Sequence, residues 1–380
     1  MPSWKLFSAD DHVDLQYLPG DMWVKRVPQK YRDRVPRLIE TKDGWHFEAD
    51  GKIFGKHYKY DDFTSAKFGK STSPVIQEPG RWRPTTPELR LEDMDRDGVE
   101  CQVMYGGLIA GFQLEEPELN AVSMRAYNEW IAEFCGASPE RLIGLGFVPV
   151  HDVDAAVQEL YNCAKLGLKG VQFQAFDAKR RIWDLAWEPL WSAAEETGIP
   201  ISFHQGGGLW SDAGIDIPLG RGVELVHITV VAAQLDEVLA ALVLSGVLER
   251  HPKFRAVLGE SSLGWIPYIL EKMDQEYDIR PRLRPIDTPK LKLKPSEYYQ
   301  RQMYATFQED HVGLKLLKEL GEDTVLWASD YPHGDSVWPD SHQIVDKDMA
   351  GMDQAVVRKI TRDNARRLYL GQQKIPTRLI

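Results

Sequence analysis

The 380-residue sequence predicts a closed (β/α)8 TIM barrel with a long N-terminal insertion that contains β-hairpins. Eight short apolar runs alternate with segments of helical periodicity along most of the chain. Apolar strands separated by helices are typical of a parallel sheet that is buried on both faces. No Gly-x-Gly-x-x-Gly follows the first strand, which removes the main reason to expect an open dinucleotide-binding sheet.

The first predicted strand begins at Leu6 and ends by Asp14 in three acids and a histidine. Residues 15–84 then form an irregular segment rich in Pro, Gly, Lys and aromatic residues. Within it, Leu38 to Phe54 predicts two polar hairpins, with turn signals at 42–44 and 49–51. Because so long a loop in a compact protein is usually functional, we expect this insertion to be a lid or an oligomer contact.

From residue 85 onward, strands and helices alternate. Thr86 is a suitable N-cap and Pro87 a suitable first-turn residue for the first of these helices. The remaining predicted strands are 99–105, 141–150, 170–174, 200–204, 254–259, 302–307 and 324–330. The predicted helices are 86–95, 118–134, 153–166, 184–197, 231–249, 264–277, 312–320 and 352–368, and residues 205–224 form a second, glycine-rich irregular stretch. We therefore expect residues 1–380 to form a single barrel domain, with 15–84 inserted.

Composition narrows the class of protein. Hydrophobic residues make up 43% of the chain and charged residues 27%, as in globular proteins with an ample core. The net charge of −11 argues against nucleic acid and anionic membranes as partners. The cysteines at 101, 135 and 163 are widely spaced, which is typical of reduced core residues, and the N-terminus lacks a signal-peptide pattern. These features predict a soluble, cytoplasmic protein that acts on a small molecule.

Polar side chains recur where the predicted strands end. In a (β/α)8 barrel the carboxyl ends of the strands meet at one mouth, where the chemistry takes place. Asp10 and His12 lie on one face of the first strand because side chains alternate along a strand. The other end residues are His204 on strand five, Glu260 on strand six and Asp330 on strand eight, with His333 just beyond. Imidazoles and carboxylates in one place predict a divalent metal site for Zn, Mn or Fe, with one ion expected and two as the alternative.

Other residues are candidates for the same pocket. His227 follows the glycine-rich stretch and is predicted to be an acid, a base or a ligand. His333 is a candidate for supporting Asp330. The residues predicted to contact substrate are Arg81, Arg83, Trp210, Trp265 and His333.

Five motifs resemble those of the amidohydrolase-related family, the branch of the amidohydrolase superfamily that includes aminocarboxymuconate-semialdehyde, resorcylate and carboxyvanillate decarboxylases. They are Ser-Ala-Asp-Asp-His at 8–12, Phe-His-Gln-Gly at 203–206, Ser-Gly-Val-Leu-Glu-Arg-His-Pro at 245–252, Glu-Ser-Ser-Leu-Gly-Trp-Ile-Pro at 260–267 and Ala-Ser-Asp-Tyr-Pro-His at 328–333. The resemblance covers most of the chain and is weakest over residues 15–84.

The resemblance implies one divalent metal held by Asp10, His12, His204 and Asp330. It also implies a further histidine that assists decarboxylation, and if its counterpart ends strand six, this chain has Glu260 there. Asp330 is then expected to ligate the metal and to act as general base or acid. Glu260 is expected to be a ligand, a base or an orienting partner of His204.

The predicted function is that of a metal-dependent hydrolase or decarboxylase acting on a small aromatic or enolic carboxylate. The first alternative is a dinuclear Fe/Fe or Mn/Fe monooxygenase that hydroxylates its substrate with dioxygen on the same barrel. The second is a non-catalytic scaffold subunit of a paired complex. Family members commonly form dimers or tetramers, so the resemblance implies a homo-oligomer, with a hetero-oligomer containing a paralogue as the alternative.

Overall fold

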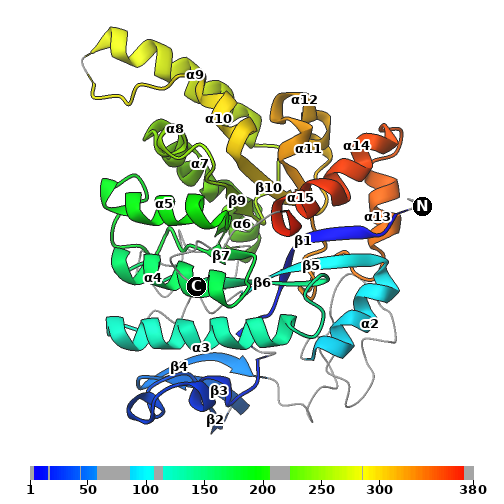
Figure 1. Cartoon of the computed structure of the whole chain (residues 1–380). Coiled ribbons are helices and arrows are strands. Elements are labelled where there is room, and N and C mark those ends of the chain that lie inside the picture. The colour runs from blue at the N-terminus through cyan, green and yellow to red at the C-terminus, as the bar shows by residue number, and fades with distance from the viewer. Residues whose placement is uncertain are drawn as a thin grey trace.

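A computed structural model of the chain describes residues 4–15, 18–42, 44–57, 86–106, 114–205, 223–284 and 286–371, and the side chains of residues 54–57, 223, 224 and 227 lie outside this description. The centre of the fold is an eight-stranded parallel sheet that curves into a barrel (Figure 1). In order around the sheet, its strands are β1 (Leu6–His12), β5 (Val99–Tyr105), β6 (Leu142–Phe147), β7 (Gly170–Gln172), β8 (Ile201–His204), β9 (Ala256–Gly259), β10 (Met303–Phe307) and β11 (Val325–Trp327).

The barrel closes between its first and last strands. The other neighbouring strands are joined by parallel ladders. At the seam between β1 and β11, the backbone N–H of Asp330 donates to the carbonyl of Asp10 at 3.0 Å, and that of His12 donates to the carbonyl of Tyr331 at 2.7 Å. The predicted (β/α)8 barrel is confirmed, and its seam lies directly at the predicted metal ligands.

Helices cover the outside of the barrel (Figure 1). Local signals fix their ends: the hydroxyl of Thr86 accepts a hydrogen bond from the backbone N–H of Leu89, and Gly98 ends that helix with a φ of 74°. The described helices after the insertion are α2 (Pro87–Asp97), α3 (Pro117–Cys135), α4 (Val153–Lys165), α5 (Glu188–Thr197), α6 (Val223–Val230), α7 (Leu235–Leu244), α8 (Val247–Arg250), α9 (Ile266–Leu283), α10 (Pro295–Gln302), α11 (His311–Lys315), α12 (Leu317–Leu320), α13 (Ser341–Asp348), α14 (Gln354–Arg358) and α15 (Asn364–Leu370). None of the described helices has the length and apolar character that crossing a bilayer requires.

The predicted hairpins form a separate antiparallel sheet of β2 (Arg37–Thr41), β3 (Gly44–Ala49) and β4 (Lys52–His57), preceded by the short helix α1 (Met22–Arg26). Glycines with positive φ lie at both turns, Gly44 at 108° and Gly51 at 79°. The sheet lies beside α3 (Figure 1). Residues 58–85 lie outside the described ranges, so the role of 15–84 as a lid or oligomer contact stays a prediction.

Several helices differ from the predicted ones. The single helix expected over 231–249 is a short 3-10 helix at Val231–Gln234 followed by α7 and α8, because Gly246 adopts a φ of 78° and breaks the helix. The helix expected over 352–368 is α14 and α15 joined by a π-helical turn at Lys359–Asp363. Helices α6, α10 and α13 are not among the predicted ones.

Two apolar cores surround the sheet. The larger one lies between the strands and the helices. A smaller cluster, with Phe7, Val103, Leu145, Val257 and Leu326 among its members, comes from residues of β1, β5, β6, β9 and β11 that face the barrel interior. All three cysteines are buried and free, as expected. Because this smaller cluster fills the barrel interior with apolar side chains, polar groups gather at the carboxyl ends of the strands.

Candidate metal centre and active site

The barrel mouth brings the predicted ligands together. His12 Nε2 lies 3.0 Å from Asp330 Oδ1 and 3.6 Å from Asp10 Oδ1. From the other side, His204 Nε2 lies 3.7 Å from the same oxygen of Asp10. Asp10, His12 and His204 each offer one donor atom within 4.8 Å of the others, and a second such group contains His12, Asp330, Glu260 and His333.

The donor atoms of this cluster fit a divalent cation. Asp10 Oδ1, His12 Nε2, His204 Nε2 and both carboxylate oxygens of Asp330 are buried and make no hydrogen bond of normal geometry. Buried polar atoms without partners are costly, so a group of them that converges on one point indicates a ligand. Two imidazoles with two carboxylates suit Zn, Mn or Fe.

The protonation of His204 agrees with a ligand role. Its Nδ1 lies 2.7 Å from the carbonyl oxygen of Gln205. A carbonyl only accepts hydrogen bonds, so Nδ1 carries a proton, and Nε2 is the nitrogen that faces the cluster and would bind a metal once it has lost any proton of its own.

Backbone strain accompanies two of the acids. Glu260 and Asp330 have φ angles of 48° and 60°, in the left-handed region that residues with a side chain seldom adopt. Each follows the end of a strand, β9 or β11. Glu260 Oε2 lies 3.3 Å from His204 Nε2. Strained residues of this kind gather at functional sites, where the surrounding structure holds them in place.

Asp10 is fixed by groups at the ends of β9 and β10. Its Oδ2 accepts hydrogen bonds from the Thr306 hydroxyl and from the Glu260 backbone N–H, both at 2.7 Å. Gly259 has no side chain to obstruct them, and a Cβ there would lie 2.9 Å from His204 Cδ2 and 3.3 Å from Asp10 Oδ2. The close approach of these strands therefore requires glycine at 259.

His333 contacts the cluster through Asp330. Its Nδ1 lies 2.9 Å from Asp330 Oδ1 and its Nε2 2.9 Å from Asp14 Oδ2, and its ring stacks on His12 at 3.9 Å. His333 thus contacts Asp330 directly, and its role in supporting Asp330 stays a prediction. Asp14 is not among the residues predicted for the site, although its spacing of two from His12 continues the alternation that links Asp10 to His12.

The charges at this mouth shift several pKa values. Burial lowers the pKa of His12 well below its ordinary value, with the charge of His333 adding to the effect, so His12 is neutral as a ligand must be. Burial also lowers the pKa of His204, but the carboxylates of Asp10 and Glu260 outweigh it and raise that pKa to about 9. Burial and the charge of Asp330 raise the pKa of Glu260 to about 7. Protons thus neutralise the cluster here, and a bound cation would displace them.

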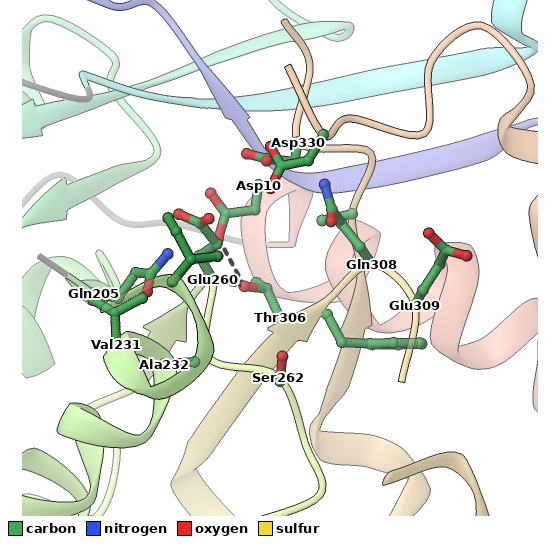
Figure 2. Close-up of a pocket in the computed structure, with 14 residues that line it drawn as sticks. Asp10, Gln205, Val231, Ala232, Glu260, Ser262, Thr306, Gln308, Glu309 and Asp330 are labelled. Atoms are coloured by element: carbon green, nitrogen blue, oxygen red, sulfur yellow. Dashed lines mark hydrogen bonds between the residues drawn. The ribbon is translucent and has the colours of Figure 1, made fainter. Parts of the chain in front are cut away.

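A cavity of about 160 Å³ opens onto the acids (Figure 2). Figure 2 shows Asp10, Glu260 and Asp330 on one side of it, with Val231 and Ala232 on another. Its lining residues are Asp10, Gln205, Ile228, Val231, Ala232, Glu260, Ser262, Thr306, Phe307, Gln308, Glu309, Ala328, Asp330 and Asp335. The cavity therefore joins the donor cluster to a wall that is partly apolar and partly polar.

The remaining predicted site residues either lie outside the description or do not line this cavity. Arg81, Arg83 and Trp210 lie outside the described residues. His227 is on α6, but its side chain is also outside the description. The indole of Trp265 donates to the carbonyl of Ser261 at 2.7 Å and packs against the larger core; it does not line the cavity described above.

The barrel, the donor cluster and the adjoining cavity define a metal-dependent enzyme. A family model described as amidohydrolase matches residues 21–370, and the chain belongs to this family.

Relatives of this chain bear the names of two kinds of decarboxylase. The chain is 28% identical over 302 residues to gamma-resorcylate decarboxylase of Rhodococcus jostii (strain RHA1), covering 74% of this chain and 87% of that protein. It is 26% identical over 250 residues to 2-amino-3-carboxymuconate-6-semialdehyde decarboxylase of Dictyostelium discoideum, covering 65% of this chain and 66% of that protein.

Solved structures share the fold. An amidohydrolase from Mycobacterium avium subsp. paratuberculosis K-10 has a TM-score of 0.76 at 20% identity, over 97% of this chain and 100% of that one. Dihydroxybenzoic acid decarboxylase from Polaromonas sp. JS666, with bound manganese and 2-nitroresorcinol, has a TM-score of 0.65 at 17% identity, over 98% and 99%. The predicted class, a metal-dependent hydrolase or decarboxylase, and the divalent metal cofactor are confirmed, whereas the roles of individual residues stay predictions.

Proposed function

We propose that this protein is a metal-dependent decarboxylase of a small aromatic carboxylate. One observation supports this most directly: buried donor atoms that make no hydrogen bond of normal geometry converge beside a cavity, in a chain related to enzymes that remove carboxyl groups. Gamma-resorcylate, the substrate named for one relative, is a dihydroxybenzoate, which makes hydroxybenzoates the first substrates to consider.

The metal would be held by Asp10, His12, His204 and Asp330. When bound, it supplies a Lewis acid that attracts the carboxylate of the substrate and stabilises negative charge. Glu260 is a further candidate ligand, since its Oε2 lies 3.3 Å from His204 Nε2, the atom that would face the metal.

The reaction needs one proton. When the bond between the ring and the carboxylate breaks, carbon dioxide leaves and the ring carbon keeps the electron pair, so this carbon takes up one proton overall. Asp330 lines the cavity and is our candidate donor. Its Oδ1 lies 2.9 Å from His333 Nδ1, which leaves Oδ2 to hold the proton for the ring carbon.

The walls of the cavity suit such a substrate. Ile228, Val231 and Phe307 offer apolar surface to an aromatic ring. Gln205 and Gln308 offer amide groups that can bond to ring hydroxyls. The oxygenase and scaffold alternatives receive less support, because the relatives reported above are decarboxylases and the four predicted ligands are all present.

The proposal is tested by incubating the manganese-loaded protein with a panel of hydroxybenzoates that includes 2,6-dihydroxybenzoate. We expect carbon dioxide release and, in D2O, one deuterium at the carbon that lost its carboxylate. Asp330→Asn should abolish both. Tyr298→Phe is the matched control, since Tyr298 is buried, bonds to Glu249 and lies outside the site; it should retain activity.

Other outcomes would replace the proposal. Hydrolysis of esters or amides without carbon dioxide release would make the protein a hydrolase. Dioxygen uptake with a hydroxylated product would make it an oxygenase. Full activity in Asp330→Asn would remove Asp330 from the proton transfer.

A further inference from the structure

Tyr331 follows the predicted ligand Asp330, and its backbone N–H, its carbonyl and its hydroxyl all make hydrogen bonds. Its backbone N–H donates to Asp11 Oδ1 at 2.9 Å, and its carbonyl accepts from the backbone N–H of His12 at 2.7 Å. Its hydroxyl donates to Asp93 Oδ2 at 2.7 Å. With 3% of its surface exposed, Tyr331 is anchored at its backbone and at the far end of its side chain.

Helix α2 supplies a second anchor through Arg90, which is fully buried. Its guanidinium carbon lies 5.0 Å from the centre of the Tyr331 ring, and its Nη2 is 3.5 Å from the Tyr331 carbonyl. The same group donates to the carbonyl of His12 at 2.8 Å and to Gln102 Oε1 at 2.7 Å. One side chain therefore joins the end of β1 and the middle of β5 to the residue after Asp330.

These contacts bear on the strained backbone of Asp330. Its φ of 60° is unfavourable for a residue with a side chain and persists only where neighbours enforce it. The backbone N–H of Asp330 bonds to Asp10, and the next residue is held by α2. Relaxation of this turn would move the Asp330 carboxylate away from His12 Nε2, now 3.0 Å away.

We propose that Arg90, Asp93 and Tyr331 form a clamp that keeps Asp330 in its left-handed conformation and so fixes the spacing of the metal donors. The three are positioning residues, because they act through Asp330 and through the His12 backbone. The inference rests on the metal-binding part of the proposed function and is independent of decarboxylation.

The test compares two buried tyrosines. Tyr331→Phe removes a hydroxyl bonded to a carboxylate at 2.7 Å. Tyr298→Phe removes one that is bonded to a carboxylate at 2.6 Å and lies on α10, which is not part of the seam. The dissociation constant for Mn²⁺ is measured by competition with a chelator, and the melting temperature of each metal-free variant is recorded. We expect Tyr331→Phe to weaken Mn²⁺ binding by about tenfold or more and Tyr298→Phe by less than about twofold. Unchanged affinity in Tyr331→Phe, or equal losses in both variants, would overturn the clamp.

A second comparison holds even if Tyr331→Phe does not fold. Arg90→Lys keeps a cation that can reach one carbonyl, whereas Arg90→Gln keeps none, so Mn²⁺ affinity should fall in the order wild type, Arg90→Lys, Arg90→Gln. Asp93→Ala should weaken binding as Tyr331→Phe does, and the double variant should lose no more than either single variant, because one hydrogen bond is removed twice. Equal affinities in the two Arg90 variants, or additive losses in the double variant, would contradict the proposal. Because Mn²⁺ binding is the readout, a protein without decarboxylase activity would still test it.

Discussion

The hydroxyl of Thr306 lies 2.7 Å from Asp10 Oδ2 and donates a hydrogen bond to it. This bond occupies one carboxylate oxygen and leaves Asp10 Oδ1 facing His12 and His204. A strand-end threonine on β10 thus determines which oxygen of a β1 acid is available to a metal.

Thr306→Val should weaken Mn²⁺ binding by about tenfold, because Asp10 loses one of the two hydrogen bonds that orient it. Binding would be measured by competition with a chelator. The control is Thr324→Val, which removes a buried hydroxyl bonded to backbone carbonyls away from the site and should leave Mn²⁺ affinity unchanged. Equal affinities in the two variants would show that Thr306 does not orient Asp10.

Gly259→Ala should displace the imidazole of His204 from the donor cluster. The added Cβ would meet His204 Cδ2 at 2.9 Å, closer than real Cβ contacts, so the imidazole must move. We expect a loss of metal content, measured by elemental analysis of purified protein. In Gly334→Ala the new Cβ meets nothing within 4 Å, and metal content should match the wild type. A fully metal-loaded Gly259→Ala protein would place His204 outside the metal shell.

Divalent metal should stabilise the folded protein. The donor cluster exists only in the folded chain. A metal ion whose free concentration is 100 times its dissociation constant therefore adds about 2.7 kcal/mol to the free energy of unfolding. Melting curves of protein freed of metal by a chelator, with increasing Mn²⁺, should show a saturable rise in melting temperature. His204→Ala should largely lose this rise. His251→Gln, a change at a buried histidine paired with Glu188, should keep it; a full rise in His204→Ala would exclude His204 as a ligand.

Asp97 should make stability fall as pH rises. Burial raises the pKa of Asp97 to about 7, from its ordinary value of 3.8, although its carboxylate accepts hydrogen bonds from the Ser341 backbone N–H and hydroxyl. Between these pH values the folded chain binds a proton that the unfolded chain has lost, so the free energy of unfolding decreases with pH, by at most about 1.4 kcal/mol per unit. Asp97→Asn cannot titrate and should show a shallower decrease from pH 4 to 7 in urea unfolding. Parallel pH profiles for the two proteins would show that Asp97 titrates alike in both states.

Much of the fold could be predicted because its signals are local. Apolar strands alternating with helices specify the barrel, and the strand ends then indicate Asp10, His12, His204, Glu260 and Asp330 without knowledge of any distance. Some local signals went unused: α10 begins with Pro295, and Glu297 accepts a bond from the Lys294 backbone N–H, a helix-start pattern present in the sequence.

The supporting residues could not be found in this way. Arg90 and Tyr331 are 241 residues apart in sequence, and His333 and Asp14 are 319 apart. Neither pair belongs to a common periodic pattern, so their contacts follow only from the packing of α2 and of the turn after β11 against the barrel seam. The left-handed φ angles of Glu260 and Asp330 could not be predicted from the sequence either, because positive φ is expected at glycine and neither residue is glycine.

The seam between β1 and β11 also bears on the stage of synthesis and folding at which the chain can bind a metal. Asp11 and Tyr331, which bond across it, are 320 residues apart, and Asp10, His12 and Asp330 lie at the same junction. During synthesis from the N-terminus, β1 is made long before β11, so the proposed set of metal ligands is incomplete until β11 has been added. With that ligand set we expect metal uptake only after the barrel has closed, and we expect a chain cut short before Asp330 to retain no cation.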